Sequence, residues 1–123
     1  MGHLEASLQE DLEEIRAKFA EMGQLVEAAV RGSIRAVLAR DRQLAYAVIL
    51  RDGLIDDAEK QIDRLCLRFI VRHQPAAGLL RFVYASIRIN LELERVGDYA
   101  EAIAREALRL SQIQAPLPLD RLR

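Results

Sequence analysis

The sequence predicts an all-α fold, an antiparallel up-down-up bundle of three helices, and three observations support this prediction. Apolar residues recur at spacings of three and four along most of the chain, which is the period of an amphipathic helix. No segment alternates apolar and polar residues over the length of a strand. The three prolines, Pro75, Pro116 and Pro118, lie at or beyond the ends of the proposed helices.

The first two apolar series each predict one long helix. The first series consists of Leu4, Leu8, Leu12, Ile15, Phe19, Met22, Val26, Ala29, Ser33 and Val37. The second opens after Asp41, a predicted N-cap, and ends at His73-Gln74-Pro75. Its members are Leu44, Val48, Ile55, Ile62, Leu65, Phe69 and Ile70.

The third helix is predicted to begin beyond Gly78 and to end before the sequence Ala115-Pro116-Leu117-Pro118. Its series runs Leu80, Val83, Ile87, Leu91, then Glu94 and Asp98 where apolar residues are expected, then Ala102, Ile103 and Leu108. We therefore expect a bundle over residues 1–115 and a proline-containing tail over 116–123. Helices of about 33 to 36 residues, joined by short connections, must lie antiparallel. The same pattern is typical of a spectrin-like repeat, a coiled-coil adaptor or half of a larger bundle.

Composition restricts the kind of protein. The chain has 123 residues, 51% hydrophobic and 30% charged, which suits one soluble globular domain. Its net charge of −1 argues against nucleic acid as a partner. The single cysteine, Cys66, excludes an internal disulfide and favours a reducing cytoplasm. We expect no signal peptide, because the chain does not open with a basic segment followed by an apolar one. We expect no direct membrane insertion, because no apolar stretch approaches the ~20 residues that span a bilayer.

Two pairs of carboxylates are the candidate site. Glu94 and Asp98 lie four residues apart on the third helix, and Asp52 and Asp56 have the same spacing on the second. If the chain folds back about Pro75, Glu94 is level with Asp56, and Asp98 is level with Asp52. Four carboxylates then converge.

Converging carboxylates repel one another, and a bound cation relieves the repulsion. Oxygen ligands suit Mg²⁺, Ca²⁺, Mn²⁺ or iron, and the lack of nearby cysteine or histidine argues against zinc and copper. The alternative is a solvated acidic stripe paired with arginines, on a purely structural helical adaptor or dimerisation module. Glu59 and Asp63 continue this stripe and are expected to be solvated.

The sequence gives no indication of an enzyme. Cys66 lies among apolar residues and is expected to be a small buried side chain, and His73 has no evident catalytic partner. No glycine-rich phosphate loop or nucleophile elbow is present. An iron-dependent redox enzyme is the remaining alternative, but neither histidine has the Glu-x-x-His spacing of di-iron bundles.

Several short motifs of the chain keep a fixed order and spacing. One is Glu92-Leu93-Glu94-Arg95-Val96-Gly97-Asp98, followed by Ile103-Ala104. The others are Met22-Gly23, Arg40-Asp41, Arg51-Asp52-Gly53-Leu54-Ile55-Asp56 with Glu59, Leu65-Cys66-Leu67 and Gln74-Pro75-Ala76-Ala77. In these motifs the sequence resembles the PhoU family of phosphate-uptake regulators, whose signature reads roughly Asp-Leu-Glu-Arg-Ile-Gly-Asp followed by Ile-Ala.

This resemblance implies a function as well as a site. It implies a cytoplasmic regulator of phosphate transport and phosphate-starvation signalling that contacts a phosphate ABC transporter and a sensor histidine kinase. It also implies a divalent or trivalent metal ion (iron, manganese, magnesium or zinc, with iron or manganese favoured) at Asp52, Asp56, Glu94 and Asp98. Family members usually contain two such repeats, so we expect this single repeat to form a homodimer. Leu79 departs from the family pattern, which commonly has Asp there.

Overall fold

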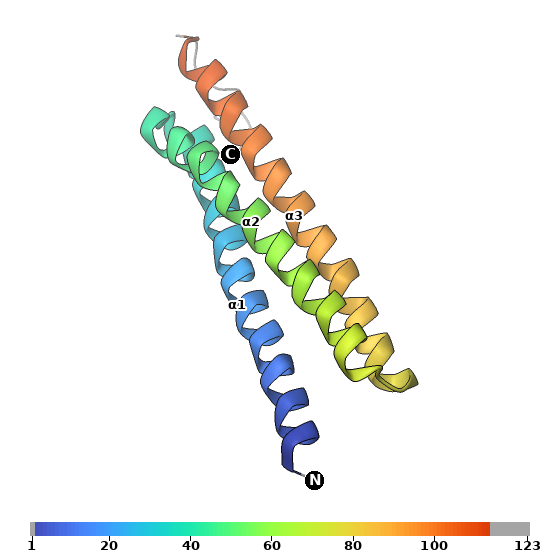
Figure 1. Ribbon diagram of the computed structural model, residues 1–123. Coiled ribbons are helices and arrows are strands. Elements are labelled where there is room, and N and C mark those ends of the chain that lie inside the picture. The colour runs from blue at the N-terminus through green and yellow to red at the C-terminus, as the bar shows by residue number, and fades with distance from the viewer. Residues whose placement is uncertain (1, 114–123) are drawn as a thin grey trace.

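The computed structural model describes residues 2–113, which form three helices and confirm the all-α prediction. Helix α1 spans Gly2–Ala39, α2 spans Arg42–His73 and α3 spans Ala77–Ser111 (Figure 1). Each helix packs against both others, in the up-down-up order that the short connections require. None of the three helices is both long enough and apolar enough to cross a bilayer.

The helix ends follow from local chemistry. Asp41 caps α2 as predicted, because its carboxylate accepts a hydrogen bond from the backbone N–H of Leu44 at 3.1 Å. At the other end, Gln74 adopts the left-handed conformation with φ of 42°, and its N–H donates to the carbonyl of Ile70. The helices differ slightly from the predicted bounds: α1 begins before Leu4, and α3 begins before Gly78. The predicted tail, 116–123, lies outside the described residues.

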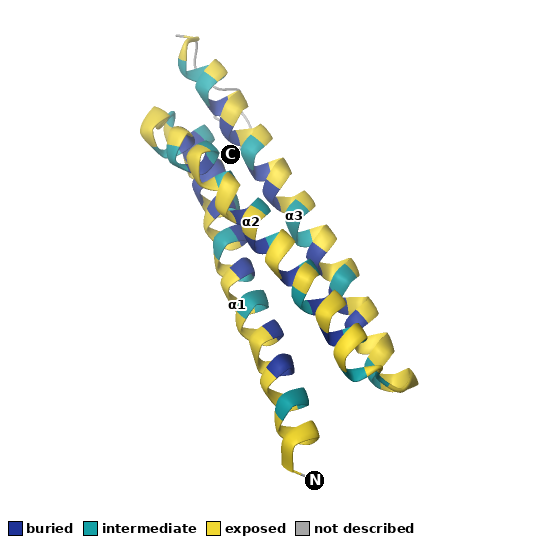
Figure 2. Ribbon diagram, in the orientation of Figure 1, coloured by how far each residue is buried: buried dark blue, intermediate teal, exposed yellow. Residues whose placement is uncertain are grey.

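The core lies along the shared axis of the three helices (Figure 2). The predicted core positions of α2 are confirmed at Val48, Ile55, Ile62 and Phe69, which are all buried. The prediction for α1 is confirmed along most of its length, but Leu4 is exposed because it lies at the end of the helix.

The predicted core face of α3 is wrong in part. Leu80, Leu91 and Ile103 are exposed, although they belong to the apolar series. The buried face consists mainly of small residues: Val83, Ser86, Asn90, Gly97, Ala100, Ala104 and Ala107. The physical reason is close approach, because small side chains let the α3 backbone come near its neighbours. Glu94 and Asp98 therefore lie beside the core face and do not interrupt it.

Gly97 is the tightest of these contacts on α3. A Cβ atom at this position would lie 3.1 Å from both Cδ1 and Cγ2 of Ile55. We predict that Gly97→Val lowers the free energy of unfolding by about 1–3 kcal/mol, because the core must shift to admit the side chain. Urea unfolding measures this change. Gly53→Val is the matched control, since Gly53 lies within α2 and nothing is within 4 Å of its Cβ position. Equal losses for both variants would contradict the prediction.

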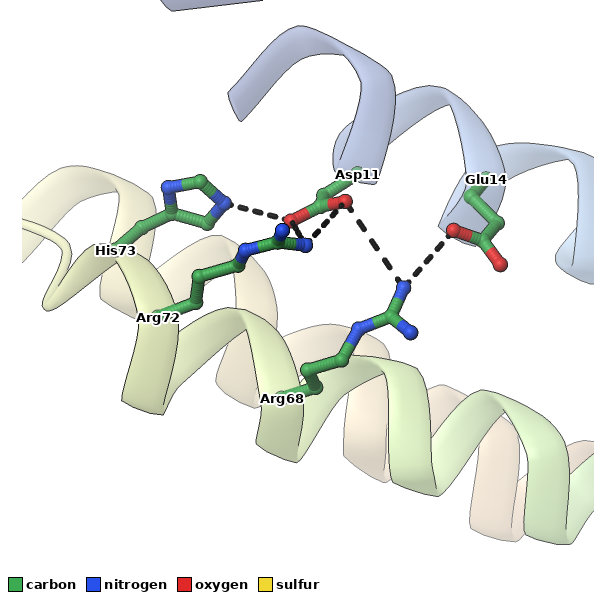
Figure 3. Close-up of polar contacts among 5 residues, drawn as sticks. All are labelled: Asp11, Glu14, Arg68, Arg72 and His73. Carbon is green, nitrogen blue, oxygen red and sulfur yellow. Dashed lines mark hydrogen bonds and ion pairs between the residues drawn. The ribbon is translucent and has the colours of Figure 1, made fainter. Parts of the chain in front are cut away.

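A polar cluster joins the first half of α1 to the end of α2 (Figure 3). Asp11 is buried, and its Oδ2 lies 2.7 Å from Nε2 of His73, whose side chain is also buried. Arg72 lies 3.3 Å from the same oxygen, and Arg68 joins Asp11 to Glu14. Sequence reasoning found no partner for His73, because Asp11 is 62 residues away in the chain.

The cluster stabilises the fold through the ionised form of Asp11. Burial would raise the pKa of Asp11, but the hydrogen bond from His73 and the charges of Arg72, His73 and Arg68 hold it below its ordinary 3.8. The stabilisation is therefore complete above about pH 4, where the unfolded carboxylate is also ionised. It is lost as the pH falls through the lower pKa of the folded state.

We predict that Asp11→Ala lowers the free energy of unfolding by about 1–3 kcal/mol at pH 7, since it leaves His73 buried without this acceptor. The difference between this variant and the parent chain should shrink in strong acid. Urea titrations at several pH values measure both effects. Glu14→Ala, which removes only an exposed partner of Arg68, should cost less than about 0.5 kcal/mol. A pH-independent loss on Asp11→Ala would contradict this account.

Candidate metal centre

The candidate site lies between α2 and α3, midway along both helices. Asp52 and Asp56 lie one turn apart on α2, as do Glu94 and Asp98 on α3. The contact of Gly97 with Ile55 brings the two backbones together between these pairs. In an antiparallel hairpin with this close contact, both acidic pairs face the interface between α2 and α3.

The structure brings all four predicted carboxylates into two adjacent groups. Oxygen atoms of Asp56, Glu94 and Asp98 lie within 4.8 Å of one another. Oxygen atoms of Asp52, Asp98 and Glu101 meet the same limit. We call these the lower and the upper acidic group, respectively. Asp98 belongs to both, so the two groups form one continuous acidic site.

Glu101 is the member that sequence reasoning missed. It follows Asp98 by three residues and Glu94 by seven, so the three share one face of α3. That spacing was a usable signal. The pairs four residues apart predict only that Asp52 meets Asp98, whereas the structure adds Glu101 to this contact.

Crowding of the carboxylates changes their proton affinity. Burial, the adjacent Glu101 carboxylate and the charges of Asp56 and Asp98 raise the pKa of Asp52 to about 7. Burial, a hydrogen bond with Asp98 and the charges of Asp98, Asp56 and Glu59 raise the pKa of Glu94 to about 7. Without a cation, Asp52 and Glu94 are therefore still partly protonated near neutral pH.

The pKa of Glu101 shifts in the opposite direction, below its ordinary value. Its carboxylate accepts hydrogen bonds from protonated Asp52 and from Arg105, and these lower its pKa despite partial burial. Arg105 holds Glu101 from the next turn of α3, with Nη2 at 2.7 Å from Oε1. Among the described residues, this is the only ion pair that any of the five carboxylates makes.

Apart from Arg105, no arginine of the described chain pairs with the site, whereas a solvated acidic stripe would have several such partners. Arg95 pairs with Glu92 instead, at 3.3 Å, and Nε of Arg64 donates to the carbonyl of Lys60. Oδ1 of Asp52 is buried and has no hydrogen-bond partner within residues 2–113. A buried oxygen without a partner is costly, and a cation seated in the upper acidic group would satisfy it. The donor set, all carboxylate oxygen, fits a hard cation.

The other residues that the sequence singled out, Glu59, Asp63 and Cys66, lie outside the two acidic groups of the described chain. Glu59 and Asp63, expected to be solvated, are half-buried and belong to neither acidic group within the described chain. The negative charge of Glu59 helps to raise the pKa of Glu94. The backbone carbonyl of Glu59 accepts a hydrogen bond from the buried Asn90 side chain at 2.8 Å. Cys66 is fully buried, as predicted, and burial raises the pKa of its thiol to about 11. Such a thiol is a packing residue.

Comparison with known proteins points to one family. The family model described as the PhoU domain matches residues 19–107. A "Phosphate-specific transport system accessory protein PhoU homolog" of Rhizobium meliloti is 37% identical over 120 residues, covering 98% of this chain and 51% of that protein. The corresponding accessory protein PhoU of Serratia marcescens is 40% identical over 116 residues, covering 94% of this chain and 48% of its own length.

A solved structure agrees with these sequence relatives. The crystal structure of PhoU from Pseudomonas aeruginosa superposes with a TM-score of 0.87 and 34% sequence identity, covering 94% of this chain and 56% of that one. The chain thus spans about half the length of the relatives that it matches.

Proposed function

Since the chain belongs to the PhoU domain family, we propose that it is a metal-binding accessory protein of phosphate transport that regulates through contacts with other proteins. The single observation that carries the metal proposal is the convergence of five carboxylates from two helices with one arginine among them. The relatives are accessory proteins of phosphate-specific transport. This agrees with the absence of a catalytic arrangement in the sequence.

The two acidic groups would hold metal in neighbouring positions. Asp56 and Glu94 would bind in the lower group, Asp52 and Glu101 in the upper group, and Asp98 would bridge them. The cation supplies positive charge that offsets the mutual repulsion of the carboxylates and ties α2 to α3. Oxygen ligands suit iron, manganese or magnesium, and the lack of histidine or cysteine in the set makes zinc a weaker candidate.

The proposed partners come from the family. We propose a cytoplasmic protein that contacts a phosphate ABC transporter and a sensor histidine kinase, and whose copies associate as a homodimer. The chain covers about half of the length of these relatives, so the partners of the whole protein are a proposal for this chain.

A binding experiment tests this function. The chain is immobilised and exposed to a phosphate ABC transporter reconstituted in detergent or nanodiscs, with Mn²⁺ supplied or chelated. We expect binding with metal, and at least tenfold weaker binding after chelation or in the variant with Asp52, Asp56, Glu94 and Asp98 replaced by alanine. Circular dichroism confirms that the variant remains helical. Failure of the metal-loaded chain to bind would contradict the proposal.

The second candidate is a structural adaptor in which the acidic groups hold protons and no metal. The observation that favours it is that Asp98, the shared member, is exposed, and exposed carboxylates are commonly solvated. The same experiment separates the two functions. Partner binding that is unchanged in the four-residue variant would support the adaptor.

A further inference from the structure

A buried amide side chain joins α3 to α2 one turn away from the acidic site. Asn90 is only 1% exposed, and its Nδ2 donates a hydrogen bond to the backbone carbonyl of Glu59 at 2.8 Å. The two residues are 31 positions apart in the chain, so the bond connects the two helices directly. Because a carbonyl oxygen has two lone pairs, that of Glu59 can accept this bond in addition to one within α2.

The amide of Asn90 is costly to bury. Its Oδ1 is buried and has no hydrogen-bond partner among the described residues. A buried polar atom without a partner destabilises the fold, whereas leucine, which has the same branched shape, would bury no polar atom here. Stability of the fold therefore does not explain why an asparagine occupies this position.

The alignment of the two helices does explain it. Four residues beyond Asn90 on α3 lies Glu94, and three residues before Glu59 on α2 lies Asp56. Since the helices are antiparallel, the bond between Asn90 and Glu59 sets Glu94 level with Asp56, about one turn away. A single buried asparagine fixes the register of packed helices in coiled coils in the same way, at a cost in stability.

The rest of the buried face of α3 does little to fix this register. Beyond Asn90, its buried residues are Gly97, Ala100, Ala104 and Ala107. Such small side chains do not interlock with α2, apart from the close contact of Gly97 with Ile55. In the metal-free chain, repulsion opposes the aligned register, because alignment brings the carboxylates of both acidic groups together.

We propose that Asn90 is a positioning residue of the acidic site: its hydrogen bond to Glu59 holds α2 and α3 in the register that assembles both acidic groups. The inference rests on the metal site of the proposed function and adds the residue that aligns this site before metal binds. Metal binds to the aligned register, so its apparent affinity falls in proportion to the fraction of chains that are aligned. Loss of the bond therefore weakens metal binding without weakening the fold.

The first test compares metal affinity with stability. Asn90→Leu removes the bond and the unpartnered Oδ1 together. We expect the affinity for Mn²⁺, measured by isothermal titration, to fall at least about tenfold, as when a supporting residue of a metal site is lost. The urea midpoint of the metal-free chain should stay level or rise.

Ser86→Ala is the matched control for this comparison. Ser86 is buried one turn before Asn90 on the same face of α3, but its hydroxyl donates within its own helix, to the carbonyl of Phe82 at 2.9 Å. Its substitution removes a buried polar group without removing a bond to α2. The affinity for Mn²⁺ should therefore stay at the value of the parent chain.

The second test observes the register directly in the metal-free chain. A Cβ at Gly97 would lie 3.1 Å from Cδ1 of Ile55, so this methyl group reports the alignment of the helices in NMR spectra. The parent chain and Ser86→Ala should each give one Ile55 methyl signal with a cross-peak to Gly97. Asn90→Leu should give additional or exchange-broadened signals. The aligned fraction should account for the fall in affinity.

Asn90→Ser repeats both tests without adding apolar volume to the core. A serine side chain ends one bond short of the amide nitrogen, and its hydroxyl bonds readily within its own helix, so the bond to Glu59 is lost. This variant should show the same mixture of registers and the same fall in affinity. It decides the question if Asn90→Leu fails to fold, which circular dichroism checks.

The outcomes separate this inference from the proposed function. A single aligned register in both Asn90 variants, or an unchanged affinity for Mn²⁺ in both, overturns the role of Asn90 and leaves the metal site intact. A parent chain that binds no metal overturns the proposed function. In that case, Ile55 signals that split in the Asn90 variants alone still support Asn90 as the residue that sets the register.

Discussion

Replacing Asp98 by asparagine is expected to weaken metal binding more than any other single substitution. Asp98 is the one carboxylate that belongs to both acidic groups, so its loss removes a ligand from each position at once. We expect the affinity for Mn²⁺ to fall by at least ~10–100-fold, the range seen when a supporting residue of a metal site is lost. Isothermal titration of the metal-free chain with Mn²⁺ measures this change.

Asp57→Asn is the matched control for this prediction. Asp57 is exposed, lies next to Asp56 on α2 and belongs to neither acidic group. It makes the same chemical change and alters the net charge equally. Its affinity for Mn²⁺ should remain within about twofold of the parent chain, since an exposed carboxylate that does not ligate the ion acts only through a charge screened by water and salt. Equal weakening by both variants would show that net charge, and not ligation, governs the binding.

The metal-free chain is expected to lose stability as the pH rises from about 4 to about 7. The pKa values of Asp52 and Glu94 are raised from 3.8 and 4.5 to about 7 in the folded state. The folded chain therefore binds these protons more tightly than the unfolded chain. Their contribution to stability is complete below the unfolded values and is lost as the pH passes the folded ones. We expect a loss on the order of 1 kcal/mol per group, since both are partly screened by solvent.

Neutral substitutes and metal should both reverse this loss. Asp52→Asn and Glu94→Gln should raise the Tm of the metal-free chain by several degrees above pH 7 and flatten its pH dependence. Mn²⁺ at a hundred times its Kd should stabilise the parent chain by about 2.7 kcal/mol and the variants by less. Differential scanning calorimetry with a chelator or with Mn²⁺ measures each case. If the metal-free parent chain instead becomes steadily more stable over this pH range, the raised pKa values of Asp52 and Glu94 are refuted.

The helices were predictable from the sequence because their signals are local. Apolar spacing located all three helices, and Asp41 and Pro75 marked the turns between them. The side of α3 that is buried was harder to predict. Hydrophobicity ranks Leu91 and Ile103 above Gly97 and Ala100, yet the close approach of the helices selects the small residues. The preference for small residues arises from packing between helices, which local periodicity does not contain.

The candidate site was predictable to the extent that it depends on register. Folding about Pro75 sets Asp52 and Asp56 level with Asp98 and Glu94, and the structure brings these residues together. Glu101 was missed, although its spacing from Asp98 placed it on the same face. The contact of Asp11 with His73 joins two distant segments through a single pair of side chains, and no periodic pattern marks it.

The most direct test of the central claim is the metal content of the tag-free chain, measured by elemental mass spectrometry after exposure to Fe, Mn, Mg, Zn and Ca. The variant with Asp52, Asp56, Glu94 and Asp98 replaced by alanine is measured in parallel. We predict one to two bound ions per chain, with iron or manganese retained best, and loss of nearly all of this metal in the variant. A parent chain that retains no metal, or a variant that retains as much as the parent, would contradict the metal-binding account.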